Sequence, residues 1–239
     1  RSPRPLQGLL DEPAVPFVQA AASPPDGLRI ACSRAFPPGT IASLEDDCAR
    51  AVDEAVELLR SLGHEVTERD PDYGFAAIPA ALARYLRGTL QDQRELEHPE
   101  RLERRTRNAA RLGSLIPQGL FERALASEPA LTERVGRLFA DHDVLLTPAT
   151  ATGPPKIGQL QGRGVLYTLN AVAPMVPYNG IWNATGQPAA SVPISLGSDG
   201  VPRGVQIVGR AGAEGTLLAL AAQLEGARPW TLQRPPGFA

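Results

Sequence analysis

The segment from residue 28 to residue 68 constrains the fold more than any other part of this sequence. It begins with a short apolar run, Leu28 to Ser33, that predicts a strand, and it ends with a second predicted strand at Glu65 to Glu68. Between them, apolar residues recur at helical spacing, which indicates a helix with one buried face. These residues are Leu44, Cys48, Val52, Val56, Leu59 and Leu62. Two strands joined by such a helix are parallel with a right-handed crossover, so the segment predicts a βαβ unit.

The ends of this predicted helix carry ordinary start and stop signals. Ser43 is followed three residues later by Asp46, and this spacing predicts a cap at the amino end of the helix. Gly63 stands in the usual position after the last turn. His64 follows in the turn, and we expect it to be exposed and without a catalytic role.

A second informative stretch runs from Tyr178 to Gly209. A cluster of turn-forming residues around Asn183 to Pro188 predicts an ordered loop. The apolar run from Ala189 to Leu196 then predicts a buried strand. A Gly-Ser-Asp-Gly turn separates it from another predicted strand, Val201 to Gly209, so the pair indicates a β-hairpin.

The rest of the chain completes a single α/β domain over residues 1–239. Residues 1–27 predict an extended lead-in with one short turn around Phe17 to Ala22, and residues 76–140 a helical insertion of three or four helices. In that insertion Glu122 to Phe139 is the clearest helix. The remaining segments are a buried parallel strand at Val144 to Thr147, a long loop at 149–164 that is a candidate lid or pocket wall, and a closing helix at Glu214 to Glu225.

Composition and charge exclude several classes of function. The formal net charge of −2 argues against nucleic-acid binding, which needs a basic face. The Arg-rich segment 101–111 is diluted by glutamates and indicates a solvated helix face. No apolar window reaches the length of a membrane span. Cys32 and Cys48 form neither a metal pair nor a disulfide framework, which favours a reduced, cytoplasmic setting.

No set of residues predicts a catalytic centre in this chain. A serine nucleophile needs a neighbouring base, but His64, His98 and His142 accompany no G-x-S-x-G motif. Lys156, the single lysine, has no Ser-x-x-Lys spacing before it. Phosphate-binding glycine loops and clusters of metal ligands are missing as well. We therefore predict no catalytic residue, no cofactor and no metal in this chain.

The motif WNATGQPAASVP, followed by GVPRGVQIVG and EGTLLALAAQLE, resembles the carboxyl-terminal part of the amidase signature family of amide hydrolases. The matching residues are Asn183, Thr185, Gly186, Pro188, Ala189, Ser191, Pro193, Gly204, Gln206, Gly209 and Glu214. The segments DVLLTPATATGPPKIG, LRIACS and LLRSLGHEV resemble other parts of the same region. The resemblance implies an α/β fold with a mixed central β-sheet flanked by helices.

The family's catalytic residues are not among the matched positions. Its Ser, cis-Ser and Lys lie in a Gly-Ser-rich region before the part resembled here, and this chain has no Ser-Ser pair. Ser191 matches a structural strand position. The resemblance implies a role in forming one pocket wall, for which we predict Met175, Tyr178, Trp182 and Asn183, because large side chains on loops near strand ends shape pockets. Trp182 is equally well explained as a core aromatic.

The resemblance implies hydrolysis of carboxamide C–N bonds in the complete enzyme, with this chain inactive by itself. Its expected partners are a small-molecule amide and a missing amino-terminal segment, or a second copy. One alternative is a non-catalytic binding or scaffold module of the same fold; another is one half of a split enzyme. A transamidating subunit that acts on tRNA shares the fold, but the balanced charge gives it no support.

Overall fold

The structure, a computed structural model, describes residue 13 and residues 15–230. About half of the predicted lead-in, residues 1–12 and 14, lies outside the described residues. The expected short turn within it is a helix, α1 (Phe17–Ala21), which packs beside the closing helix α9 (Glu214–Ala227). None of the described helices has the length and apolarity needed to cross a membrane.

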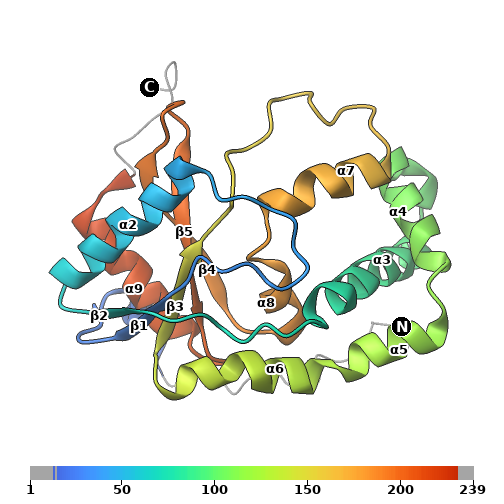
Figure 1. The fold of residues 1–239 in the computed structure, drawn as a ribbon. Coiled ribbons are helices and arrows are strands. Elements are labelled where there is room, and N and C mark those ends of the chain that lie inside the picture. Colours follow the sequence, from blue (N-terminus) through green and yellow to red (C-terminus); the bar gives the residue numbers. More distant parts are fainter. Residues whose placement is uncertain (1–12, 14, 231–239) are drawn as a thin grey trace.

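A mixed sheet of five strands forms the centre of the described part (Figure 1). The order across the sheet is β2-β1-β3-β5-β4; β2, β1 and β3 are parallel, and β5 runs antiparallel to both of its neighbours. The strands are β1 (Arg29–Cys32), β2 (Glu65–Glu68), β3 (Val144–Pro148), β4 (Ala189–Leu196) and β5 (Pro202–Gly209). The predicted mixed sheet, parallel βαβ unit and hairpin are confirmed.

Helices cover both faces of this sheet, and the larger share continues to one side of it (Figure 1). The α-helices not yet named are α2 (Asp46–Ser61), α3 (Ala77–Glu95), α4 (Arg104–Ser114), α5 (Gln118–Ala126), α6 (Glu128–Gly136), α7 (Val165–Val172) and α8 (Gly180–Thr185). Short 3-10 turns are η1 (Pro99–Arg101), η2 (Arg137–Ala140) and η3 (Ala173–Met175). The division into a domain core and a helical insertion at 76–140 stays a prediction.

Alternation along the strands creates two apolar cores. In β3, Val144 and Leu146 point to one face and Leu145 to the other, as the two-residue period of a strand requires. The first face packs against α2 and α9, through residues such as Leu59 and Leu220. The second face packs against α3, α6 and α8. The central strand is therefore buried on both sides, which explains its uninterrupted apolar sequence.

The start of α2 differs from the prediction. The helix begins at Asp46, and its cap position is occupied by the extended residue Glu45 rather than by Ser43. Glu45 is held there by the loop after β3, because its backbone N–H donates to the carbonyl oxygen of Ala151 at 2.8 Å. The predicted stop is confirmed, since Gly63 adopts a left-handed φ of 92°.

His64 is buried, and the prediction that it is exposed was wrong. Its side chain is 4% exposed, and its Nδ1 accepts the backbone N–H of Leu28 at 3.2 Å. This bond leaves the proton on Nε2, which donates to Oε1 of Gln223 at 2.9 Å. Gln223 lies on α9, far along the chain, so neighbouring sequence could not indicate the burial.

Two further predicted elements change their form. The single helix expected from Glu122 to Phe139 is divided at Ser127 into α5 and α6, because Pro129 has no N–H to continue the bonding pattern and is tolerated only in a first turn. The loop expected around Asn183 is instead the short helix α8, which ends at Gly186 with a φ of 74°.

Replacing Asp143 by asparagine tests how β1 and β3 are joined at their amino ends. The Asp143 carboxylate accepts the backbone N–H of Arg29 at 2.9 Å and its guanidinium at 3.0 Å, and these bonds hold the pKa of Asp143 below its usual range. A lowered folded-state pKa stabilises the fold above the unfolded pKa and loses that effect as pH falls. We expect D143N to lower the free energy of unfolding by about 1 kcal/mol or less at pH 7, with the difference disappearing as the pH falls through the lowered folded-state pKa of Asp143. A difference independent of pH in chemical denaturation would contradict this explanation.

Candidate functional site

A pocket of about 390 Å³ lies where the chain leaves the carboxyl end of β3. Its wall comes from the loop after β3, from α7 and η3, and from the β4–β5 hairpin. The lining residues are Ala149, Thr150, Thr152, Gly153, Pro154, Pro155, Val172, Met175, Val176, Ser191, Pro202 and Gly204. In open α/β sheets, ligand sites form at such strand ends, so this pocket is the candidate binding site.

Backbone hydrogen bonds hold the loop after β3 in place on two sides. On one side Ala151 donates its N–H to the carbonyl oxygen of Met175 at 2.8 Å, which ties the loop to η3. On the other side the N–H of Gly153 donates to the Glu45 carboxylate at 2.8 Å. The pocket wall is thus a fixed part of the fold, although it contains no regular secondary structure between β3 and α7.

Buried hydrogen bonds connect the sheet with the segment before α8. The Gln206 amide donates to Oγ1 of Thr147 at 3.2 Å and to the carbonyl oxygen of Tyr178 at 3.3 Å. The Tyr178 hydroxyl in turn donates to the carbonyl oxygen of Arg34 at 3.0 Å. Burial raises the pKa of Tyr178, so its hydroxyl stays a neutral donor. These bonds fix the position of the chain between η3 and α8.

Arg203 holds the turn of the β4–β5 hairpin and lies next to Gly153 of the pocket wall. It is 5% exposed, and it pairs with Asp199 at 3.1 Å while donating to the carbonyl oxygen of Val201 at 3.0 Å. Burial is the largest single influence and opposes its charge, but the hydrogen bond to Asp199 and the nearby negative charges together outweigh it, so the pKa of Arg203 is raised. A Cβ atom at Gly153 would lie 2.6 Å from the Arg203 guanidinium, so a larger residue at that point of the pocket wall would require the Arg203 side chain to shift.

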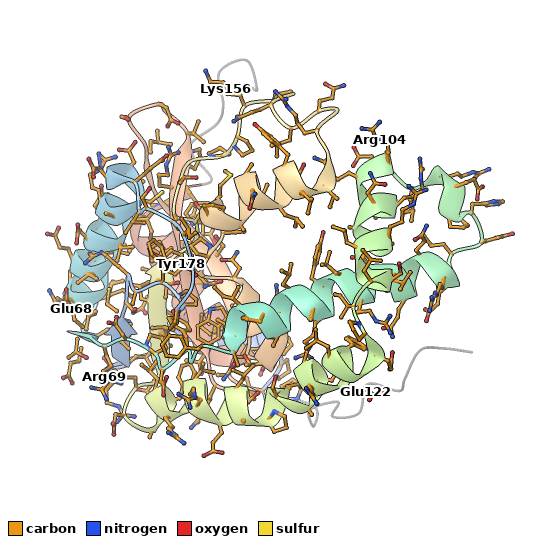
Figure 2. The ribbon with its side chains drawn as sticks, turned by 45° about the vertical axis from the view of Figure 1, so that its right-hand side comes forward. Glu68, Arg69, Arg104, Glu122, Lys156 and Tyr178 are labelled. Atoms are coloured by element: carbon orange, nitrogen blue, oxygen red, sulfur yellow. The ribbon has the colours of Figure 1, made fainter. Side chains whose placement is uncertain are left out.

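The structure places the four predicted pocket residues at different depths. Met175 lines the pocket. Tyr178, labelled in Figure 2, is fully buried, and its ring lies 5.3 Å from that of Phe36. Trp182 is buried in the second core, 6.2 Å from the ring of Tyr73, and Asn183 is exposed on α8. A contribution of any of the four to substrate binding stays a prediction.

Sequence reasoning missed Ser191 as a pocket residue and treated it as a structural strand position. The signal was present in the alternation of β4, because Val192 and Ile194 face the first core and Ser191 must face the opposite side. The loop at 149–164 was expected to be a pocket wall, and its first residues do line the pocket.

The pocket lining can bind an uncharged group but supplies no activated nucleophile. All of its residues are apolar or hydroxyl-bearing, and its single serine, Ser191, has no histidine or lysine beside it in the lining. Lys156 projects from the outer loop, far from Tyr178 (Figure 2). The described residues contain no group of three or more potential metal ligands that could hold an ion.

A mixed sheet flanked by helices, with an uncharged, hydroxyl-bearing pocket at its strand ends, defines an α/β fold with a candidate binding site. A model of the Amidase family matches residues 4–218, and the chain belongs to that family. This finding confirms the resemblance to amidase signature enzymes.

The relatives are about twice as long as this chain. It is 48% identical to "Putative amidase AmiB2" of Mycobacterium tuberculosis, over 92% of this chain and 47% of the relative. The 6-aminohexanoate-cyclic-dimer hydrolase of Paenarthrobacter ureafaciens is 32% identical over 92% of this chain and 48% of its own length.

Solved structures of amidases also match this chain over about half of their own length. A 6-aminohexanoate cyclic dimer hydrolase structure superposes with a TM-score of 0.82 at 29% identity, over 98% of this chain and 52% of its own. A bacterial aryl acylamidase of the amidase signature family superposes with a TM-score of 0.71 at 20% identity, over 92% and 48%, and shares the fold. The chain therefore spans about half the length of the curated relatives it matches.

Proposed function

We propose that this chain supplies one wall of the substrate pocket of an amidase that hydrolyses carboxamide C–N bonds. The supporting observation is that this chain, a member of the family, has a pocket with an uncharged lining. It has no Ser-Ser pair, and no lysine lines the pocket. The reactive Ser, cis-Ser and Lys would come from the rest of an amidase polypeptide. Met175, with the hydroxyls of Thr150, Thr152 and Ser191, would contact the amide substrate.

The exposure of α7 supports an incomplete site. Its sequence, VLYTLNAV, is apolar, yet none of its residues is buried in the described structure, and Leu166 is 64% exposed. A soluble protein rarely leaves such a helix uncovered. The helix leads directly into η3 and the pocket residues Val172 and Met175, so whatever covers α7 would also close the pocket. The two buried, unpaired cysteines are compatible with a reduced, cytoplasmic setting.

Catalysis by the chain alone and in a complex provides the direct test. We expect the isolated chain to hydrolyse no aryl amide and to show no labelling by a fluorophosphonate probe, because it lacks an activated serine. Mixing it with the portion of M. tuberculosis AmiB2 outside the aligned region should produce amide hydrolysis and label a serine of the added portion. Mass spectrometry of the labelled peptide identifies which chain carries the label.

One control and two possible outcomes separate the alternatives. The AmiB2 portion assayed alone should be inactive if the wall from this chain is required. Labelling of Ser191 or of any other serine in this chain would contradict the proposal. A complex that forms and binds amides but never hydrolyses them would favour the non-catalytic scaffold.

A further inference from the structure

We infer that the pocket at the end of β3 selects substrates by a neutral carboxamide N–H and rejects a carboxylate or an ammonium group at the same place. This inference rests on the proposed function, and it specifies the substrate class of that site. It concerns the part of the substrate away from the bond that is cleaved. The supporting observations are the charge of the pocket wall, the bonds that its hydroxyl protons make, and its supply of N–H donors.

The wall offers no opposite charge to an ion. No charged side chain is among the described residues that line the pocket. Two charged side chains adjoin the wall at Gly153, and both are engaged with other groups. The Glu45 carboxylate accepts the Gly153 N–H at 2.8 Å, and Arg203 pairs with Asp199 at 3.1 Å. An ion that entered the pocket would lose water without gaining a partner, so the wall favours an uncharged group.

The hydroxyls of Thr150 and Thr152 present lone pairs, and not protons, to a ligand. Oγ1 of Thr150 donates to the carbonyl oxygen of Thr152 at 2.9 Å, and Oγ1 of Thr152 donates to the carbonyl oxygen of Gly153 at 3.1 Å. A hydroxyl has one proton and two lone pairs, so each of these groups can still accept a hydrogen bond. A ligand that binds to them must therefore supply the proton.

Donors are scarce in the same wall. Some lining residues are prolines, which have no N–H: Pro154, Pro155 and Pro202. The N–H of Ala149 donates to the carbonyl oxygen of Gly204 at 3.1 Å, and that of Gly153 is bound to a carboxylate. The Ser191 hydroxyl can rotate and provide one donor. One donor suits the single carbonyl oxygen of a carboxamide better than the two oxygens of a carboxylate.

Apolar side chains supply the rest of the lining and fit a short alkyl segment. Val172 lies at the end of α7, Met175 in η3, and Val176 directly after it. The volume of about 390 Å³ is near the lower end of the range for small-molecule sites. The wall therefore suits a short alkyl chain that carries a carboxamide.

Binding of small amides to the full chain tests this preference directly. Met175 is the single methionine in the sequence, so ¹³C labelling of methionine methyl groups gives one NMR signal from the pocket. We expect N-methylacetamide to bind about fivefold or more tightly than N,N-dimethylacetamide, which lacks the N–H. Acetate and methylammonium should bind about tenfold more weakly than N-methylacetamide, or not at all.

Two pairs of variants separate this preference from a general loss of structure. Replacing both Thr150 and Thr152 by valine removes the acceptors and should reduce the advantage of N-methylacetamide to about twofold or less, whereas serine at both positions should retain it. Met175→Lys adds a cation to the wall and should raise the affinity for acetate about tenfold, while the uncharged Met175→Gln should not. Threonine methyl signals report on the Met175 variants. Misfolding cannot produce such a gain of affinity.

Several results would overturn the inference. These are equal affinities for the two acetamides, tighter binding of acetate than of either amide, and equal gains of acetate affinity in Met175→Gln and Met175→Lys. Absence of any shift at the highest soluble concentration of N-methylacetamide would overturn it as well.

Hydrolysis by the complex with the AmiB2 portion makes the outcome separable from that for the proposed function. Among anilides of adipic acid, the one that ends in a primary carboxamide should have a kcat/KM about fivefold or more above those that end in a dimethylamide or a carboxylate. Amide binding with the stated preference but without hydrolysis would retain the pocket's selectivity and reject the enzyme. Hydrolysis of all three anilides at equal kcat/KM would retain the enzyme and reject the selectivity.

Discussion

Replacing Trp182 by alanine is expected to lower the free energy of unfolding by about 3–5 kcal/mol, as for other buried tryptophans. The side chain is 3% exposed and packs in the second core, near Tyr73 and beneath the sheet residues Leu145 and Val208. Its removal would leave a cavity that α8 and the sheet cannot close without moving the segment before α8. Urea denaturation followed by circular dichroism measures the loss.

The neighbouring residue provides a matched control. Asn183 lies on the same short helix but is exposed, so Asn183→Ala should change the free energy of unfolding by no more than about 0.5 kcal/mol. If Trp182→Ala unfolded at the same urea concentration as the unchanged chain, the core assignment would be wrong. A selective rise in KM of the reconstituted complex, without loss of stability, would then favour the predicted pocket role.

Replacing Gly113 by alanine is expected to destabilise the packing of α4 on α3. A Cβ atom at this position would lie 2.1 Å from the carbonyl oxygen of Leu86 and 2.7 Å from its carbonyl carbon. Because these are backbone atoms, α4 itself must shift, and we expect a loss of about 3 kcal/mol, the upper part of the range for overpacked cores. Thermal and urea unfolding would both report the change.

Gly119 on α5 serves as the control for helix propensity. An added Cβ there meets no heavy atom within 4 Å. Gly119→Ala should therefore raise the free energy of unfolding by about 0.5–1 kcal/mol, because alanine loses less backbone entropy on folding. Shifts of the same sign and size for the two variants would show that α3 and α4 do not approach as closely as described.

Local patterns in the sequence were sufficient for the main elements of the fold. The apolar spacing from Cys48 to Leu59 predicted α2, and the apolar run from Val144 predicted β3. The turn at 197–200 predicted the hairpin. Each pattern reports on contacts between near neighbours or on one face of one element, which is why it can be read without the fold. The motif around Asn183 identified the family in the same way.

Contacts between distant segments decided the rest. Glu45 replaced Ser43 at the start of α2 because the loop after β3 holds it, and His64 became buried because α9 covers it. The pocket combines Ser191 with residues 149–155 and Met175, which only the packing of η3 and the hairpin brings together.

The sequence by itself determined the βαβ unit, the hairpin and the family, since each depends on local spacing or a continuous motif. The tertiary structure alone decided that Trp182 belongs to the core, that Met175 and Ser191 share a pocket, and that β4 pairs with β5 as the outer strand of the described sheet. The physical reason is that burial and strand pairing depend on which distant residues come into contact, and no local pattern specifies that.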